Sequence, residues 1–156
     1  MNFTHLTNEL SIYQQDRIVF VGLGNKLRAD DAAGLKIIER LKSQKVFKDS
    51  QFIMAGRNPE NHLQVILNCN PDIVVFIDAA EWNGSAGDVK IFNDEEIDQT
   101  EFSTHTFSIK MIKDYLLNQQ EMNFMFIGIQ PLRTNYKQGL SEPVQIAIEK
   151  FFCDEV

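Results

Sequence analysis

The hydrophobic residues of the chain form short continuous runs that alternate with segments of helical periodicity. The runs are typical of strands buried on both faces of a parallel sheet. Residues 73–77 form the most hydrophobic and β-branched run, and are therefore expected at the sheet centre. Residues 88–92 alternate more and follow Gly84 and Gly87, which indicates an antiparallel edge strand. The strands are predicted at residues 17–22, 51–55, 73–77, 88–92 and 124–129.

Helical spacing of apolar residues predicts helices between these strands. Asp30 can cap a helix of about three turns. Asn58 followed by Pro59 suits the start of the next helix. A third helix begins near 103–106, and a fourth runs from 142 to about 152 after Ser141. Apolar residues expected on the inner face of the third helix include Phe107, Met111 and Tyr115.

The alternation of strands and helices predicts an α/β fold. We expect a three-layer domain with a twisted, mostly parallel five-stranded sheet, one antiparallel strand, and helices on both faces. The 156 residues are expected to form one domain, residues 1–156, with residues 1–16 as an irregular N-terminal extension. Ligands of such folds collect at the carboxyl ends of the strands.

Composition narrows the possible partners. The net charge is −7 and no block of Lys and Arg occurs, so a nucleic-acid partner is disfavoured. No apolar run approaches the roughly 20 residues of a membrane-spanning helix, so no membrane partner is expected. Cys69 and Cys153 follow no metal-binding spacing and are expected to be packing residues. Without a signal peptide before them, the expected compartment is a reduced cytoplasm.

Three residues stand where turns would expose them beside the sheet: Asp31, Asp78 and His105. Asp31 follows the glycines of the first strand, Asp78 ends the central strand, and His105 lies at a predicted helix start. Two carboxylates and one imidazole can hold a divalent transition metal and leave positions open for substrate or water. The three residues are therefore the candidate metal ligands and catalytic groups.

Each residue also has an ordinary explanation. Asp31 in a first helical turn is favoured by the helix dipole alone. His105 could be a surface residue near a helix cap, although the dipole there disfavours a protonated ring. Asp78 is harder to explain without a function, because an unpaired carboxylate at the end of an apolar strand is costly to desolvate. A metal ion or a hydrogen-bond donor would compensate it.

The turn 22–25, Gly-Leu-Gly-Asn, also invites a dinucleotide-binding interpretation. The third glycine of that motif is absent, because position 27 is Leu. Asp30 and Asp31 would also place negative charge where a pyrophosphate rests. A tight turn that presents Asp31 explains the glycines better. A nucleotide-binding module is kept as an alternative, tested by thermal shift with NAD, ATP or FMN.

Other polar residues carry less functional signal. His5 and His62 are expected to be surface or packing residues. Glu60 and Asn61 open a helix that could border the same crevice, although a favourable first turn also explains them. No Gly-x-Ser-x-Gly elbow occurs, and neither cysteine lies in a charged, glycine-rich turn. Covalent catalysis is therefore the less natural mechanism.

Several motifs together resemble the hydrogenase maturation endopeptidases, which process the large subunit of nickel-iron hydrogenases. The resemblance covers residues 17–152. Its motifs are Gly22-Leu23-Gly24-Asn25, Asp30-Asp31-Ala32-Ala33-Gly34, Pro59-Glu60-Asn61, Ile77-Asp78-Ala79, Thr104-His105 and Ile127-Gly128-Ile129-Gln130-Pro131. Their order and spacing together are more specific than any one of them.

The resemblance implies a function and a site. It implies that Asp31, Asp78 and His105 bind the metal, and that the metal is nickel supplied by the substrate precursor. It implies removal of a short C-terminal extension from that precursor once nickel has been inserted. The family fold also agrees with the predicted alternation. Two mechanisms stay open: water activated by the metal, or hydrolysis with Asp31 or Asp78 as the base. A metal-sensing or chaperone domain that binds the precursor without cutting it is the alternative from another class.

One motif departs from the family. Relatives commonly carry an Asp-Gly-Gly turn after the second strand, whereas this chain has Met54-Ala55-Gly56-Arg57. If this turn shapes the cleft, substrate choice differs here and Arg57 contacts the partner. The three candidate ligands are unaffected.

Overall fold

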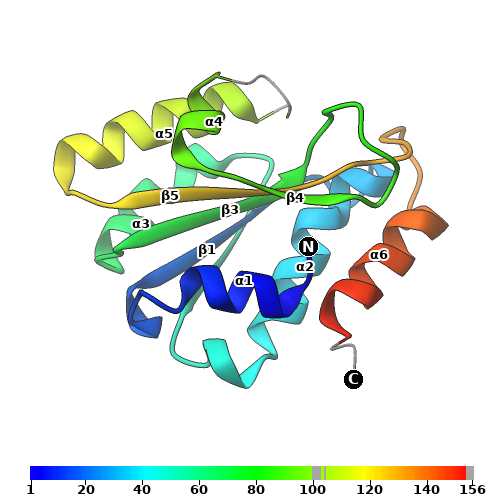
Figure 1. The fold of residues 1–156 in the computed structure, drawn as a ribbon. Helices are drawn as coiled ribbons and strands as arrows, with labels where there is room; N and C mark the ends of the chain where they lie inside the picture. The colour runs from blue at the N-terminus through cyan, green and yellow to red at the C-terminus, as the bar shows by residue number, and fades with distance from the viewer. Residues whose placement is uncertain (100–102, 104, 154–156) are drawn as a thin grey trace.

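A computed structural model describes residues 1–99, 103 and 105–153. A five-stranded sheet lies between two layers of helices (Figure 1). Its elements are α1 (Phe3–Leu10), η1 (Gln15–Arg17), β1 (Ile18–Leu23), η2 (Ala29–Ala32), α2 (Ala33–Lys42), η3 (Lys45–Phe47), β2 (Gln51–Gly56), η4 (Pro59–His62), α3 (Leu63–Asn68), β3 (Ile73–Ala79), β4 (Val89–Phe92), α4 (Asp94–Gln99), α5 (Thr106–Gln119), β5 (Asn123–Ile129) and α6 (Glu142–Phe152).

The sheet confirms the predicted fold class. Its strand order is β2-β1-β3-β5-β4, with β4 antiparallel to β5 and the other pairs parallel. β3 lies at the centre, as its apolar sequence predicted, and β4 is the antiparallel edge strand. From β1 the chain passes to β2 on one side and later to β3 on the other. The carboxyl ends of β1 and β3 therefore form a topological switch point, where α/β proteins bind ligands.

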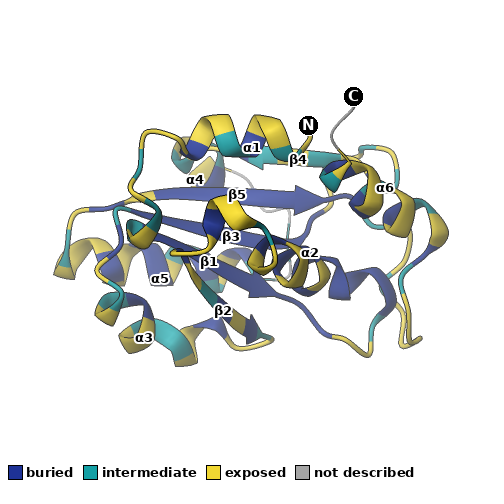
Figure 2. Cartoon of the chain, turned by 90° about the horizontal axis from the view of Figure 1, so that it is seen from below, coloured by how far each residue is buried: buried dark blue, intermediate teal, exposed yellow. Residues whose placement is uncertain are grey.

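Alternate residues of the strands build two cores. One face packs against α1, α2 and α6 through residues such as Phe20, Val75 and Ile127. The opposite face packs against α3, α4 and α5 through residues such as Val21, Phe76 and Phe126. Figure 2 shows the inner strands β1, β3 and β5 buried between the helices, whereas the edge strands β2 and β4 are partly exposed. Successive residues of a strand point to opposite faces of the sheet. Because both faces of the inner strands are buried, every residue along them can be apolar, which explains the continuous apolar runs.

The N-terminal segment is not irregular, contrary to the prediction for residues 1–16. Phe3–Leu10 forms helix α1, capped by the Asn2 side chain, which accepts a 2.9 Å hydrogen bond from the backbone N–H of His5. Leu6 and Leu10 are fully or almost fully buried in the core beneath it. Their spacing of four residues puts both on one face of the helix. This short amphipathic pattern was too sparse to be predicted as a helix.

Three helical expectations need correction. Asp30 lies in η2 and does not cap α2. The segment from Pro59 begins as the 3-10 turn η4, and α3 follows it. In α5, Ile109, Ile112 and Leu116 face the core. The predicted inner residues of α5 are instead exposed, Phe107 by 75%, Met111 by 57% and Tyr115 by 44%.

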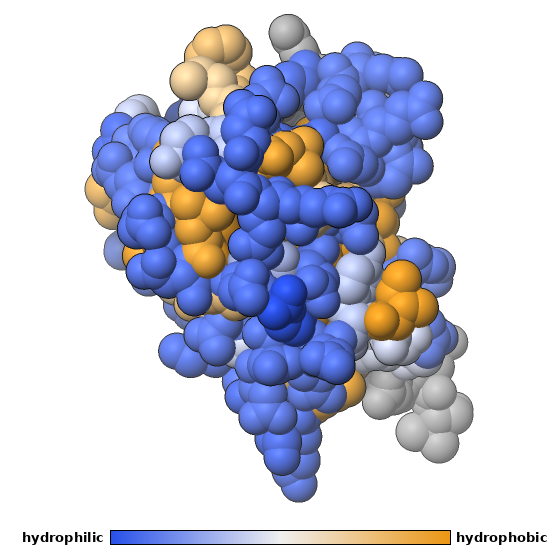
Figure 3. All heavy atoms as spheres, turned by 90° about the vertical axis from the view of Figure 1, so that its left-hand side faces the viewer, coloured by the Kyte–Doolittle hydropathy of each residue, from blue (hydrophilic) through white to orange (hydrophobic). Residues whose placement is uncertain are grey.

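The two ends of the parallel strands differ in character. Figure 3 shows the end where the parallel strands begin, and hydrophilic residues cover most of that face. The turns that carry the conspicuous sequence motifs lie at the other end, after β1 and β3 and before α5. No helix among the described residues is long and apolar enough to cross a membrane.

Candidate active site

The turn after β1 places Asp31 at the carboxyl edge of the sheet. Gly24 has φ +131°, and a Cβ there would lie 1.9 Å from the backbone oxygen of Asp31, so this close approach requires glycine. The backbone N–H of Asn25 donates a 2.9 Å hydrogen bond to Oδ2 of Asp31. The glycine turn therefore holds a carboxylate, as the sequence predicted.

Asp78 is the next-to-last residue of β3 and is fully buried. Its Oδ1 accepts a 2.8 Å hydrogen bond from the backbone N–H of Ala79. Its Oδ2 accepts a 2.6 Å hydrogen bond from the Ser103 hydroxyl and lies 2.7 Å from Nδ1 of His105. These partners compensate the desolvation of the carboxylate, which the sequence identified as costly.

His105 is the N-cap residue of α5, and its side chain is 13% exposed. Its backbone N–H donates to the hydroxyl of Ser103 at 3.1 Å, and that hydroxyl in turn donates to Asp78. Ser103 also forms a turn with Thr106 through their backbone and side-chain groups. Ser103 thus fixes both members of the Asp78–His105 pair, and sequence analysis had assigned it no role. Thr104, which precedes His105 in the Thr104-His105 motif, lies outside the described residues.

The ionisation of the site is shaped by its concentration of negative charge. Burial lowers the pKa of His105, but the hydrogen bond and charge of Asp78 and the charges of Asp31 and Glu60 outweigh it, so its pKa is raised. This shift is opposite in direction to the one expected from the helix start, whose dipole disfavours a protonated ring. Burial raises the pKa of Asp31, and the charge of Asp78 raises it further.

Asp31 connects two small hollows at this edge. One, of about 200 Å³, is lined by Asn25, Arg28, Asp31, Arg57, Asn58, His105 and Tyr136. The other, of about 170 Å³, includes Arg28, Asp31, Ser103 and Pro131 in its lining. Arg28 and Asp31 belong to both, so the hollows meet at these residues. The departure from the family turn thus places Arg57 beside the candidate site.

The three candidate residues lie together, but they do not form a finished metal cage. Asp78 contacts His105, and Asp31 shares a hollow with His105. Two carboxylates and an imidazole suit a divalent transition metal by donor type. Among the described residues, however, no group of three or more His, Cys, Asp and Glu is arranged to hold a metal ion. Asp78 Oδ2 is instead committed to Ser103 and His105.

Two framework residues hold the loops around the site. Asp30 is fully buried, and its carboxylate accepts hydrogen bonds from the backbone of Leu132, Arg133 and Ser141 and from the Ser141 hydroxyl. Gln130 Oε1 accepts 3.0 Å hydrogen bonds from the backbone N–H groups of Trp82 and Gly84. Asp30 and Gln130 of the sequence motifs therefore have a structural role, because their hydrogen bonds hold these loops.

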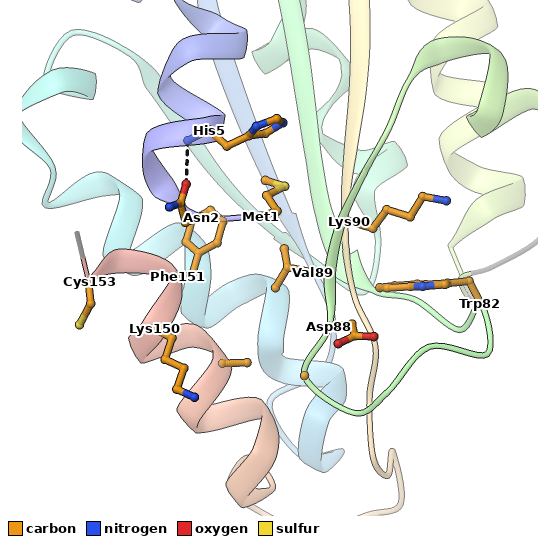
Figure 4. Close-up of a pocket in the computed structure, with 12 residues that line it drawn as sticks. Met1, Asn2, His5, Trp82, Asp88, Val89, Lys90, Lys150, Phe151 and Cys153 are labelled. Carbon is orange, nitrogen blue, oxygen red and sulfur yellow. Dashed lines mark hydrogen bonds between the residues drawn. The ribbon is translucent and has the colours of Figure 1, made fainter. Parts of the chain in front are cut away.

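Of the other candidates from the sequence, Glu60 acts on His105 through its charge, whereas the remaining histidines and the cysteines take no part in the contacts of the site described above. His5 is on α1, and His62 is a half-buried residue at the end of η4. Cys69 is half-buried. Cys153 is exposed, so the prediction that it is a packing residue is wrong. A larger cavity of about 810 Å³ lies between α1, β4 and α6 (Figure 4). Asp31, Asp78 and His105 do not line it.

Comparison with known proteins identifies the family. A family model described as HycI hydrogenase maturation protease matches residues 35–153. The chain belongs to the hydrogenase maturation protease family. It is 30% identical over 141 residues to a putative hydrogenase maturation protease of Methanocaldococcus jannaschii, covering 86% of this chain and 83% of that protein. It is 24% identical to the hydrogenase 3 maturation protease of Escherichia coli, covering 86% and 85%.

Solved structures of the family share the fold. The nickel-iron hydrogenase maturation protease HycI of Thermococcus kodakarensis superposes with a TM-score of 0.75 at 32% identity, over 86% of each chain. The hydrogenase maturating endopeptidase HybD of Escherichia coli has a TM-score of 0.72 at 24% identity, over 85% of each chain. The protein is thus a peptidase of this family, and the edge that carries Asp31, Asp78 and His105 is its candidate active site.

Proposed function

We propose that this protein is an endopeptidase that removes the C-terminal extension of the nickel-loaded precursor of a nickel-iron hydrogenase large subunit. The observation that carries the proposal is the meeting of Asp31 with the hydrogen-bonded Asp78–His105 pair at the switch point of the sheet. Family membership supplies the class of reaction. The compartment we propose is the cytoplasm, where thiols such as Cys69 and Cys153 stay reduced.

Nickel enters this proposal as part of the substrate. Asp31, Asp78 and His105 would close on nickel already held by the precursor, so that only a loaded subunit completes the site. Burial is the main cause of the raised pKa of Asp31, and the charge of Asp78 adds to it; for His105, the hydrogen bond and charge of Asp78 and the charges of Asp31 and Glu60 outweigh burial. This concentration of carboxylates also favours a divalent cation. Binding energy from nickel would then license cleavage, because the correct substrate assembles its own recognition site.

The two mechanistic routes place different demands on the carboxylates. If the metal activates water and polarises the scissile carbonyl, all three residues act as ligands. If a carboxylate is the base, Asp31 is better placed than Asp78. Asp31 lines both hollows and has a raised pKa, which makes it a stronger base. Asp78 is fully buried and already accepts hydrogen bonds from Ala79, Ser103 and His105.

Arg57 is proposed to contact the precursor. It lines the hollow that contains Asp31 and His105, and also a neighbouring one of about 350 Å³ along the end of β2. An exposed guanidinium there can bind a carboxylate or a backbone carbonyl of the substrate. Substrate choice among hydrogenases would then depend partly on this turn.

The deciding experiment measures the mass of the large subunit in cells that lack this protein. We expect an extended subunit, trimmed when the wild type is restored and left extended with Asp78→Ala. Normal trimming in cells without the protein would overturn the proposal. A purified protein that binds the nickel-loaded precursor without shortening it would instead identify a metal-sensing or chaperone domain. Replacing Asp78 with Asn refines the mechanism, because retained nickel binding with lost cleavage favours the base role.

A further inference from the structure

Three large apolar side chains are exposed on the loops beside the candidate site. Leu27 is 60% exposed, Leu132 is 55% exposed and Tyr136 is 78% exposed. Leu27 precedes Arg28 and Leu132 follows Pro131, and both of these neighbours line the hollows at Asp31. Tyr136 itself lines one of those hollows. Single exposed apolar residues are common, but a group at the rim of one site calls for an explanation.

The loops that carry these side chains are tied into one unit. A backbone bridge joins Arg28 and Lys137. The N–H of Ala29 donates to the carbonyl of Lys137 at 2.7 Å, and the N–H of Asp30 donates to that of Arg133 at 3.1 Å. The buried carboxylate of Asp30 accepts further hydrogen bonds from Leu132, Arg133 and Ser141. Residues 27–30 and 132–141 are therefore held together as one unit, called here the docking platform, which exposes Leu27, Leu132 and Tyr136.

One exposed side chain of the platform, that of Tyr136, is positioned by a neighbouring residue. The Arg28 guanidinium donates through Nε to the carbonyl of Thr134 at 3.0 Å and lies 5.3 Å from the centroid of the Tyr136 ring. A stacked aromatic ring on a fixed loop loses little conformational freedom on binding. Tyr is also over-represented among the residues that dominate protein interfaces. Part of the cost of ordering the Tyr136 ring is therefore met in the free protein.

The site itself is too small to supply the specificity that a protein substrate needs. The hollows at Asp31 have volumes of about 200 and 170 Å³, below the roughly 300 Å³ at which pockets begin to enclose a drug-sized ligand. They can receive only a short part of an extended chain. The rest of the substrate must pass over the rim, and the platform forms part of that rim.

We infer that the docking platform binds the folded body of the large-subunit precursor while its C-terminal segment enters the site. This inference rests on the proposed function and adds the surface by which the partner is held. The interaction is apolar in character, made by Leu27, Leu132 and Tyr136, and separate from nickel recognition by Asp31, Asp78 and His105. Binding of the precursor therefore has one component that depends on nickel and one that depends on the platform.

The test compares two variants in the Asp78→Asn background, which we expect to leave the extension on the precursor during titration. The first is Leu27→Ser with Leu132→Ser. The second is Ile12→Ser, a matched control, because Ile12 is 82% exposed on the segment before β1, away from the site. The dissociation constant is measured with purified nickel-loaded precursor. We expect at least tenfold weaker binding for the platform variant and no change for the control.

The outcomes separate this inference from the proposed function. Binding by the platform variant within twofold of its parent overturns the docking surface, whatever the cleavage assay shows. Loss of binding in the platform variant, together with a wild type that binds but never shortens the precursor, keeps the docking surface and overturns the peptidase proposal. Thermal melting checks that each variant folds. A further platform variant, Tyr136→Lys, tests the same surface by placing a charge on it. Unaltered binding of the precursor by Tyr136→Lys also counts against the inference.

Discussion

Nδ1 of His105 lies 2.7 Å from Oδ2 of Asp78, joining the start of α5 to the end of the central strand. The carboxylate is fully buried, and the imidazole is the more exposed partner. The pair resembles the carboxylate–histidine arrangement that fixes a ring for metal binding or proton transfer. Asp78 can therefore serve the site by orienting His105, in addition to any direct contact with nickel.

The first prediction concerns the ionisation of this pair. The charge of Asp78 and its hydrogen bond both raise the pKa of His105. Asp78→Asn removes this charge and weakens the hydrogen bond. We expect the pKa of His105 to fall in the metal-free variant. Titration of the imidazole by NMR measures it directly, and His5 and His62 provide internal references in the same spectra. An unchanged pKa of His105 would show that Asp78 does not control the ring.

A second prediction concerns the dependence of stability on pH. Asp31 and His105 both have a raised pKa in the folded protein, so the folded state binds more protons than the unfolded state. The contribution of His105 is fully present below its unfolded pKa of about 6.5 and is lost as the pH rises through its folded value. The contribution of Asp31 is lost in the same direction, from about pH 4 upward.

The metal-free protein should therefore lose free energy of unfolding at this site as the pH rises from about 4 to neutral. Urea denaturation of wild type and His105→Asn from about pH 5 to about pH 9 measures the part that comes from His105. The difference in unfolding free energy between the two proteins should stay constant below about pH 6.5 and shrink as the pH rises above that value. A difference that grows with pH would contradict the assigned shift. Divalent nickel should reverse the trend, because its ligands must be deprotonated.

The sequence predicted the sheet well because the inner strands β1, β3 and β5 are buried on both faces. Their apolar runs have one explanation, and β4 was recognised by its alternation and its glycines. Asp31 was found because Gly24 and Asp31 approach each other within one local turn. Asp78 was found because a charge at the end of an apolar strand needs compensation. These signals come from residues that are close together in the sequence, so they indicate Asp31 and Asp78 as candidates without knowledge of the fold.

The unpredicted parts depend on contacts between distant segments. Ser103 binds Asp78 across 25 positions, and Asp30 binds Ser141 across 111 positions. Local rules made Asp30 a helix cap, because they contain no information on the loop that it meets. The inner face of α5 was wrong for a similar reason, since both Phe107 and Ile109 are apolar and only packing on the sheet selects Ile109. Helix α4, Asp94–Gln99, was not predicted, because Ile97 is its one buried apolar residue.

A third prediction follows from the long-range contacts of Asp30. Asp30→Ala removes an acceptor from three backbone N–H groups and one hydroxyl in a region where Asp30 and Ser141 are fully buried. We expect a loss of about 3 kcal/mol or more in the free energy of unfolding. Urea denaturation measures the loss. Asp49→Ala is the matched control, because Asp49 is exposed and its replacement should cost less than about 0.5 kcal/mol. Equal effects of the two substitutions would show that Asp30 does not hold the loops.

The last prediction concerns the approach of α2 to the sheet. A Cβ on Gly34 would lie 2.4 Å from the backbone oxygen of Ile77 and 2.8 Å from that of Leu23, at the ends of β3 and β1. Backbone atoms cannot give way as a side chain can, so Gly34→Ala must move α2 or the strand ends. We expect a loss of about 3 kcal/mol of stability, despite the better helix propensity of Ala.

Gly22→Ala provides the comparison for Gly34→Ala. A Cβ on Gly22 would meet only the side chain of Ile38, at 3.1 Å, which can adjust. Its cost should be about 1 kcal/mol. Because Ile77 precedes Asp78, Gly34→Ala should also slow precursor trimming more than Gly22→Ala does, when both are assayed at a temperature where both proteins are folded. Equal stability and equal trimming of the two variants would mean that the contact of α2 with the strand ends does not position the site.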